Sequence, residues 1–203
     1  MTPLATDLSG LLRLVILSVT APRMAARYLV ATELSRAVLW QVLLLVTLLS
    51  VLLVAITQGP MPDLPPDSAA PISITPFAYT VILGASLVML VFGLYFTGQS
   101  LGGTGSFPAT LAIVIWMEVL GMAIRVMLAV VTLIAPMITG IAAIIAFGVL
   151  LWVLVNFLSV LHDFQSIGKA VLTLVLAVVG ISIGITLILT IIGVSLTGGS
   201  LNV

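Results

Sequence analysis

The sequence predicts an all-α membrane protein, a polytopic bundle of five transmembrane helices preceded by an interfacial amphipathic region. The first observation is the composition: 62% of the residues are apolar and only 6% are charged, whereas an ordinary soluble domain is about 25% charged. The second is that five stretches are long enough to cross a bilayer as helices, which takes about 20 apolar residues. The third is that these stretches lack the alternating polarity of a transmembrane β-strand.

Breaks rich in proline and glycine separate the five predicted spans, because both residues interrupt helices. Residues 60–71 hold five prolines and predict an extended loop exposed to water. Ala135 and Pro136 alone separate the third and fourth spans, which predicts a tight turn between antiparallel neighbours. We expect a cytoplasmic segment at residues 1–36, a membrane domain at residues 37–203, and spans at residues 37–57, 77–97, 109–134, 137–161 and 169–196.

The distribution of positive charges predicts the orientation of the bundle. Short cytoplasmic flanks of membrane proteins are enriched in Lys and Arg. If the N-terminus is cytoplasmic, every cation outside the spans falls on the cytoplasmic side, and the external loops carry only Asp63 and Asp67. These cations are Arg13, Arg23, Arg27, Arg36 and Lys169. We therefore expect an integral protein of the bacterial inner membrane, with its N-terminus inside and its C-terminus outside.

The N-terminal segment is apolar at residues 8–19, but this stretch is too short to span a bilayer. A signal peptide is one alternative, since the residues before Pro22 resemble a cleavage site, but Pro22 would then follow the cut. The preferred interpretation is a helix in the membrane interface followed by a second helix that begins at Pro22; packing beneath the bundle is the other alternative. In the preferred arrangement Arg13, Arg23, Arg27 and Arg36 contact lipid headgroups.

The third span holds two charged residues near the middle of the membrane. Glu118 and Arg125 are two helical turns apart, so both project from one face. Gly121 lies between them on that face, where a glycine lets the backbone of another helix pack closely. A charge at this depth is costly unless it is paired or hydrated. A structural ion pair that fixes helix packing is the preferred interpretation, because a proton or ion relay usually needs a chain of titratable groups. A hydrated functional site is the alternative.

Polar or small residues follow one face of each of the last two spans. A stripe on the fourth span predicts a packing seam, with a cavity open to the cytoplasm as the alternative. On the fifth span a small-residue stripe predicts close packing against a neighbouring helix. His162 is a lone histidine beside a loop and a poor candidate for a metal ligand. The polar stripe is Trp152, Asn156, Ser159 and Asp163, and the small-residue stripe is Thr173, Ala177, Gly180 and Gly184.

The residues needed for most kinds of catalysis are absent from the sequence. The chain has no cysteine and one histidine, which excludes disulfides, iron–sulfur clusters and Cys/His zinc sites. Its formal net charge of zero offers no basic face for nucleic acid. The segment GGTGS lacks the lysine of a phosphate-binding loop. We expect no enzyme activity, no catalytic residue, no cofactor and no metal.

Three segments resemble the Yip1-domain family of five-span membrane proteins, in its bacterial branch. They are TAPRMAARYL before the first span, GGTGSFPATLAIVIWME leading into the third, and LHDFQSIGKAV leading into the fifth. The resemblance implies five spans and a cytoplasmic N-terminus. Eukaryotic members bind lipid-modified Rab-type GTPases in membrane trafficking and carry an Asp-Leu-Tyr-Gly-Pro motif, which this chain lacks. No residue is therefore assigned to GTPase binding.

These observations favour a non-enzymatic membrane protein that binds or organises other membrane components, as a Yip1-like scaffold or accessory subunit. Its partners are membrane lipids and either another membrane protein or a second copy of the chain. A small channel or transporter that uses Glu118 and Arg125 is the alternative from a different class. A lipid-modifying enzyme is the least favoured, because the chain offers no nucleophile with an adjacent base.

Overall fold

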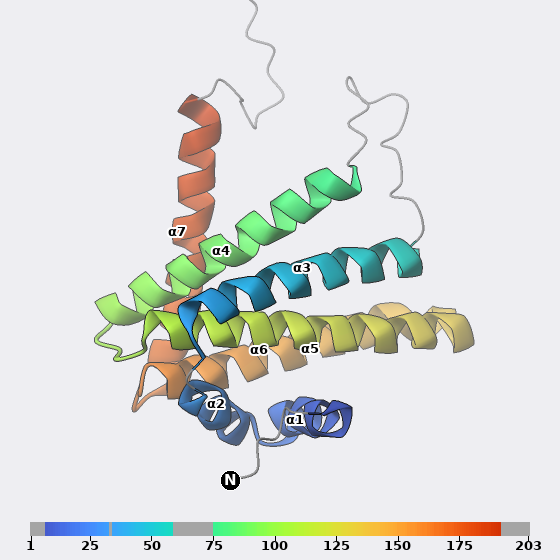
Figure 1. Ribbon diagram of the computed structural model, residues 1–203, viewed down its shortest axis with the longest axis horizontal. Helices are drawn as coiled ribbons and strands as arrows, with labels where there is room; N and C mark the ends of the chain where they lie inside the picture. The colour runs from blue at the N-terminus through green and yellow to red at the C-terminus, as the bar shows by residue number, and fades with distance from the viewer. Residues whose placement is uncertain (1–6, 33, 59–74, 192–203) are drawn as a thin grey trace, which may run out of the picture.

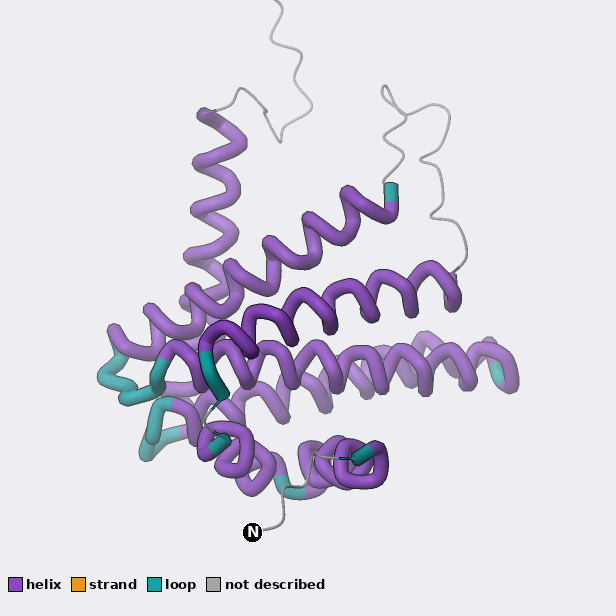
Figure 2. The backbone as a smooth tube through the Cα atoms, in the orientation of Figure 1, coloured by secondary structure: helices purple, strands orange, loops and turns teal. Residues whose placement is uncertain are grey.

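The computed structural model describes residues 7–32, 34–58 and 75–191, and every regular element in these ranges is a helix (Figure 1; Figure 2). The predicted loop at residues 60–71, with Asp63 and Asp67, and the predicted end of the last span at residue 196 lie outside the described residues. The elements are α1 (Leu8–Thr20), α2 (Pro22–Ala31), α3 (Arg36–Gln58), α4 (Pro76–Ser100), α5 (Phe107–Ile134), the short 3₁₀ helix η1 (Pro136–Ile138), α6 (Thr139–Leu161) and α7 (Ile167–Ile191).

Five of these helices are long and apolar enough to cross a bilayer, with spans of 21 to 28 residues. They are α3, α4, α5, α6 together with η1, and α7, and they overlap the five stretches expected from the sequence. The predicted all-α polytopic bundle is therefore confirmed.

Local sequence accounts for where several of the helices begin. α4 and α5 each start with a capping hydroxyl and a proline in the first turn. The Oγ1 of Thr75 accepts a hydrogen bond from the backbone N–H of Ala78 at 3.1 Å, and the Oγ of Ser106 accepts one from Ala109 at 3.3 Å. Between α5 and α6, the expected tight turn takes the form of the three-residue helix η1.

The spans converge at one end of the bundle and diverge at the other. We call the end where α3, α5 and α7 begin and α4 and α6 end the α2 end, because α2 lies beside it, and the opposite end the far end. α3, α5 and α6 run side by side, whereas α4 and α7 fan away from them towards the far end (Figure 1). α4 packs on α7, and α5 contacts α3, α4, α6 and α2.

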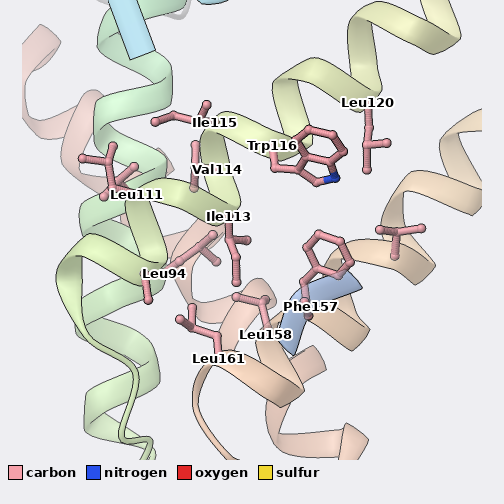
Figure 3. Packing of buried hydrophobic residues seen from close by; sticks show 14 of the residues in the cluster. Leu94, Leu111, Ile113, Val114, Ile115, Trp116, Leu120, Phe157, Leu158 and Leu161 are labelled. Carbon is pink, nitrogen blue, oxygen red and sulfur yellow. The ribbon is translucent and has the colours of Figure 1, made fainter. Parts of the chain in front are cut away.

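The hydrophobic core is concentrated towards the α2 end. Buried residues of α5 run from Ala109 to Gly121, whereas most of the large apolar residues after Arg125 are exposed, up to 85% for Leu133. Side chains of α5 point into the core between α4 and α6, where Leu94, Phe157 and Leu158 meet them (Figure 3). The far half of each span therefore presents apolar surface to its surroundings, as lipid-facing helices do.

The two N-terminal helices pack against the side of the bundle formed by α5 and α6. One face of α1, with Gly10, Leu14 and Ser18, is buried, and the Oγ of Ser18 accepts a hydrogen bond of 2.9 Å from Nε1 of Trp116 on α5. The opposite face keeps Leu8 and Ile16 exposed. α1 thus combines contact with the bundle and an outward apolar row suited to lipid, so it unites features of both arrangements considered from the sequence.

Candidate functional site

The charged residues of α5 form a closed cluster with one hydroxyl of α3. An Nη2 atom of Arg125 lies 2.8 Å from Oε1 of Glu118. The hydroxyl of Ser50 donates a hydrogen bond to the same carboxylate oxygen and accepts one from Nη1 of Arg125. The Glu118 side chain is 10% exposed and that of Arg125 33%. This cluster compensates the buried carboxylate with a cation and a hydroxyl, which offsets the cost of removing it from water.

Gly121 has a different role from the one expected from the sequence. We expected it to admit the backbone of another helix, but the nearest atoms to a Cβ at this position belong to the guanidinium of Arg125, at 3.4 Å. Side chains of a helix lean towards its N-terminus. The missing side chain therefore leaves room for Arg125 to fold back along α5 and reach Glu118.

A cavity of about 540 Å³ opens beside this cluster on the side of the far end. Its walls come from the last turns of α3 and α5 and include Thr57, Thr132 and Arg125. Glu118 is not among the lining residues, and its side chain stays buried. The cavity thus reaches the cation of the cluster but not the carboxylate.

The predicted polar stripe on α6 joins two helices and a loop. The side-chain oxygen of Asn156 accepts a hydrogen bond of 3.2 Å from Nε of Arg23, on α2, and Ser159 donates to the carbonyl of Phe164. Asn156 and Ser159 are buried, whereas Trp152 and Asp163 are exposed. Only the middle of the stripe therefore lies in a helix seam.

A larger cavity of about 680 Å³ lies at the α2 end. It is enclosed by α2, the turn between α4 and α5, the first turn of α5, and the end of α6 with the loop after it. Arg23 and Arg27 enter it from α2, and Asp163 from the loop. Ser159 and Asp163 of the polar stripe are among its lining residues, and we call it the arginine cavity.

The other arginines expected to contact lipid headgroups lie apart from this cavity. Arg13 is exposed on α1, and Arg36 is exposed at the first position of α3. Neither residue lines the arginine cavity. All four arginines are exposed, and they divide into a pair that lines one cavity and a pair that does not.

His162 is almost completely buried at the α2 end. Its side chain occupies a cradle of three glycines, Gly98 at the end of α4 and Gly103 and Gly105 in the following turn, each so close that an added Cβ would overlap the ring. The ring stacks on Phe164 with centroids 5.3 Å apart. Within the described residues neither ring nitrogen has a hydrogen-bond partner.

The protonation of His162 follows from this burial. Desolvation lowers its pKa, and this effect outweighs the opposing influence of the backbone carbonyl of Leu94, which does not reach hydrogen-bond geometry with the ring. The neutral form is therefore favoured in the folded protein. Among the described residues no group of three or more His, Cys, Asp or Glu side chains is placed to hold a metal ion.

The small-residue stripe on α7 is packed over only half of its length. Thr173 and Ala177 are buried, and the Oγ1 of Thr97 on α4 donates a hydrogen bond of 3.3 Å to the carbonyl of Thr173. Gly180 and Gly184, further towards the far end, have no atom within 4 Å of an added Cβ. They line an apolar groove of about 370 Å³ between α4 and α7.

Comparison with known families agrees with this architecture. The model of the Yip1 domain matches residues 16–195, almost the whole chain. The chain belongs to the Yip1-domain family. No curated protein and no solved structure is detectably similar to this Yip1-domain protein. Membership supports a multi-pass membrane protein in contact with lipid, in agreement with its five apolar helices.

The three segments that carried the family resemblance meet at the α2 end of this Yip1 domain. The first segment contributes Arg23 and Arg27 to the arginine cavity. The second contributes Gly103 and Gly105 to the glycine cradle, and the third contributes His162, whose ring fills that cradle. The backbone N–H of Thr104 also donates a hydrogen bond of 3.2 Å to the carbonyl of His162. The motifs therefore build one continuous region, although long stretches of sequence separate them.

The sequence analysis did not predict two features of the structure, the contact of Ser50 with Glu118 and the burial of His162. Ser50 was one hydroxyl in an apolar run, and nothing local to it indicated that it faces Glu118. His162 was treated as a loop residue, although its burial is nearly complete. The only available signal was the unusual glycine density between residues 98 and 105, which indicates space reserved for another group.

Proposed function

We propose that this Yip1-domain protein is a non-enzymatic scaffold or accessory subunit that binds and organises other components of the bacterial inner membrane. In this proposal the α2 end faces the cytoplasm, because the arginines of α2, Arg36 and Lys169 gather there. The partner is another membrane protein or a second copy of the chain, which packs against the spans within the bilayer.

The open half of α7 is the observation that carries this proposal. Small residues on a transmembrane helix let another helix approach closely, and van der Waals packing then drives association. Within the described residues this packing ends at Ala177, whereas Gly180 and Gly184 continue the same stripe with no neighbouring atom near an added Cβ. The fanning of α4 and α7 leaves the groove between them accessible from the membrane (Figure 1).

Site-specific cross-linking tests the proposal, and the absence of cysteine from the chain makes single-cysteine variants clean. Gly180→Cys places a reactive thiol in the groove. Gly148→Cys is the matched control, because Gly148 is also exposed, also has no atom within 4 Å of an added Cβ, and lies equally far from the α2 end along its own helix.

Both variants are treated in native membranes with a short, membrane-permeant cross-linker that joins a thiol to a nearby side chain. We expect a discrete adduct from Gly180→Cys and none from Gly148→Cys. An adduct of twice the chain mass identifies a second copy, and another mass identifies a different partner. The same adducts from both variants, or none from Gly180→Cys, contradicts the proposal.

The cavity beside Arg125 supports a second candidate, a small channel or transporter. A cavity that reaches an intramembrane charge resembles the vestibule of an ion pathway. In proteoliposomes with an entrapped pH-sensitive dye, a proton pathway through this cluster gives a flux that Glu118→Gln abolishes. A scaffold gives the flux of empty liposomes for both proteins.

A further inference from the structure

We infer that the arginine cavity is a binding site for a phosphate-bearing group. This site is separate from the groove of α4 and α7 and goes beyond the proposed scaffold function. Its walls combine two guanidinium groups with uncharged hydrogen-bonding side chains from three other segments. The polar and charged lining residues are Arg23, Arg27, Thr104, Ser106, Ser159, Asp163 and Gln165.

The two arginines are placed to act on one ligand. They are four residues apart on α2 and therefore share a face of that helix. The opposite contacts of α2 are made by Ala25 and Ala26, which are fully buried and fix the helix against the bundle. Both guanidinium groups consequently line the same cavity from a rigid support.

Arg23 is also oriented by a neutral partner. Its Nε donates to the side-chain oxygen of Asn156, a neutral acceptor, so no described carboxylate is paired with this guanidinium. The one ion pair within the described residues is that of Glu118 and Arg125. Planar guanidinium groups hold phosphate oxygens through paired hydrogen bonds, which lysine cannot match.

The first turn of α5 adds to the positive potential of the cavity. Ser106, the N-cap of this long helix, and Ala109 both line the cavity. The N-terminus of a helix carries a partial positive charge equivalent to about half an elementary charge. Asp163 opposes these groups with one negative charge. Two guanidinium groups and a helix N-terminus outweigh that single carboxylate.

The size of the cavity indicates the class of ligand. Its volume of about 680 Å³ falls within the range of roughly 300–1,000 Å³ typical of sites for small organic ligands, so it holds more than an inorganic phosphate ion. A phosphate ester on a polar organic group fits this space. The headgroup of a phospholipid and a soluble phosphate ester share this chemistry, and the experiment separates them.

The test uses the full chain, purified in a neutral detergent, and follows its thermal unfolding during ligand titration. One series adds a phospholipid with an anionic glycerol headgroup in mixed micelles, and the other adds glycerol 3-phosphate. Arg27→Gln is the primary variant because Arg27 makes no side-chain hydrogen bond within the described residues, so its loss leaves the seam with α6 intact. Arg23→Gln/Arg27→Gln removes both guanidinium groups.

The matched control is Arg13→Gln/Arg36→Gln, which removes the same charge from exposed positions outside the cavity. We expect Arg27→Gln to weaken binding about tenfold, as the loss of one charge-assisted contact does, and the double cavity variant to weaken it further. The control variant should retain wild-type affinity within about twofold. Asp163→Asn should tighten binding, because it removes the opposing charge from the cavity wall.

The two ligand series identify the source of the phosphate group. Binding of the lipid alone indicates a headgroup site, and competition by glycerol 3-phosphate indicates that the site also accepts soluble esters. Equal losses of affinity in the cavity variant and the control variant would show diffuse attraction to a basic surface and overturn the inference. Wild-type protein that binds neither ligand overturns it as well.

Discussion

Two buried polar side chains of this protein, Glu118 and His162, are accommodated away from water in different ways. The carboxylate of Glu118 lies beside the guanidinium of Arg125 and accepts a hydrogen bond from the hydroxyl of Ser50. The imidazole of His162 has no hydrogen-bond partner within the described residues, and its burial favours the neutral form. The stability that Glu118 contributes should therefore depend on Arg125, and the stability that His162 contributes should depend on pH.

Removal of one partner from the α5 ion pair should cost more stability than removal of both. Arg125→Met leaves the Glu118 carboxylate buried without a cation, a loss of about 3 kcal/mol. Glu118→Gln/Arg125→Met leaves no buried charge and should recover part of that loss. Thermal unfolding of Glu118→Gln, Arg125→Met and the double variant in detergent measures the coupling. Additive losses would show that the two residues do not act as a pair.

Burial of His162 should make the stability of the fold sensitive to mild acid. Its pKa in the folded protein lies below the ordinary value near 6.5, so the unfolded chain takes up a proton first as the pH falls. Stability is complete above pH 6.5 and declines as the pH drops towards the lower folded pKa. Thermal unfolding at pH 7.5 and 5.5 should show this decline.

His162→Leu is the variant that isolates this effect. It should reduce the difference in stability between the two pH values, whatever its effect at pH 7.5. Asp163 and Lys169, the charged residues on the adjoining loop and on α7, are present in both proteins and cancel in the comparison. An unchanged pH dependence in His162→Leu would assign the decline to other groups.

At the scale of elements, the ring of His162 connects the end of α4, the turn into α5 and the loop into α7. Glycines in the first two segments accept it, and Lys169 donates a hydrogen bond of 3.4 Å from α7 back to the carbonyl of Leu101. The end of each helix in this group is thereby tied to another. These contacts hold the ends of α4, α5 and α7 together at the α2 end.

Gly98→Ala should destabilise the protein because its methyl group would occupy the position of the His162 ring. Overpacking of this kind costs about 1–3 kcal/mol. Gly148→Ala, on the exposed surface of α6 with no atom within 4 Å of the added Cβ, should be neutral or slightly stabilising. Thermal unfolding of the two variants gives the comparison directly.

A second substitution tests whether the ring is the cause. Gly98→Ala/His162→Ala removes the overlap, so alanine at position 98 should cost much less in a protein that already has His162→Ala. The same cost in both backgrounds would place the strain elsewhere in the turn.

Sequence reasoning succeeded for these elements where the signal was local. Apolar runs and the prolines at positions 76, 108 and 136 predicted the spans and the breaks between them. It failed where the determining contact is distant in sequence, as for Ser50 and Glu118 or Gly98 and His162. Periodicity places residues on a face of a helix but does not say which helix that face meets. Gly121 is an example, because the atoms closest to an added Cβ there belong to Arg125 of the same helix and not to a neighbouring helix.

At the scale of the whole molecule, the protein is tightly packed at the α2 end and open at the far end. α3, α5 and α6 form the compact part, and α4 and α7 diverge from it (Figure 1). Hydropathy could not predict this divergence, because a lipid-facing helix and a helix in a bundle have the same composition in a membrane.

The orientation of the molecule is the prediction at this scale. Reporter fusions after Ser68 and at the C-terminus should both report an external location, because the positive-inside rule places the arginine-rich α2 end in the cytoplasm. A reporter inserted in the α6–α7 loop, after Gln165, is the matched control and should report a cytoplasmic location. A cytoplasmic signal from either of the first two fusions contradicts this topology.

The glycine cradle of His162 also has an evolutionary consequence. A side chain added at Gly98, Gly103 or Gly105 would overlap the ring of His162 in its present position. We therefore expect these four positions to vary together during evolution. In an alignment of related chains, a lineage that replaces the histidine with a small residue should be the lineage in which the glycines begin to vary.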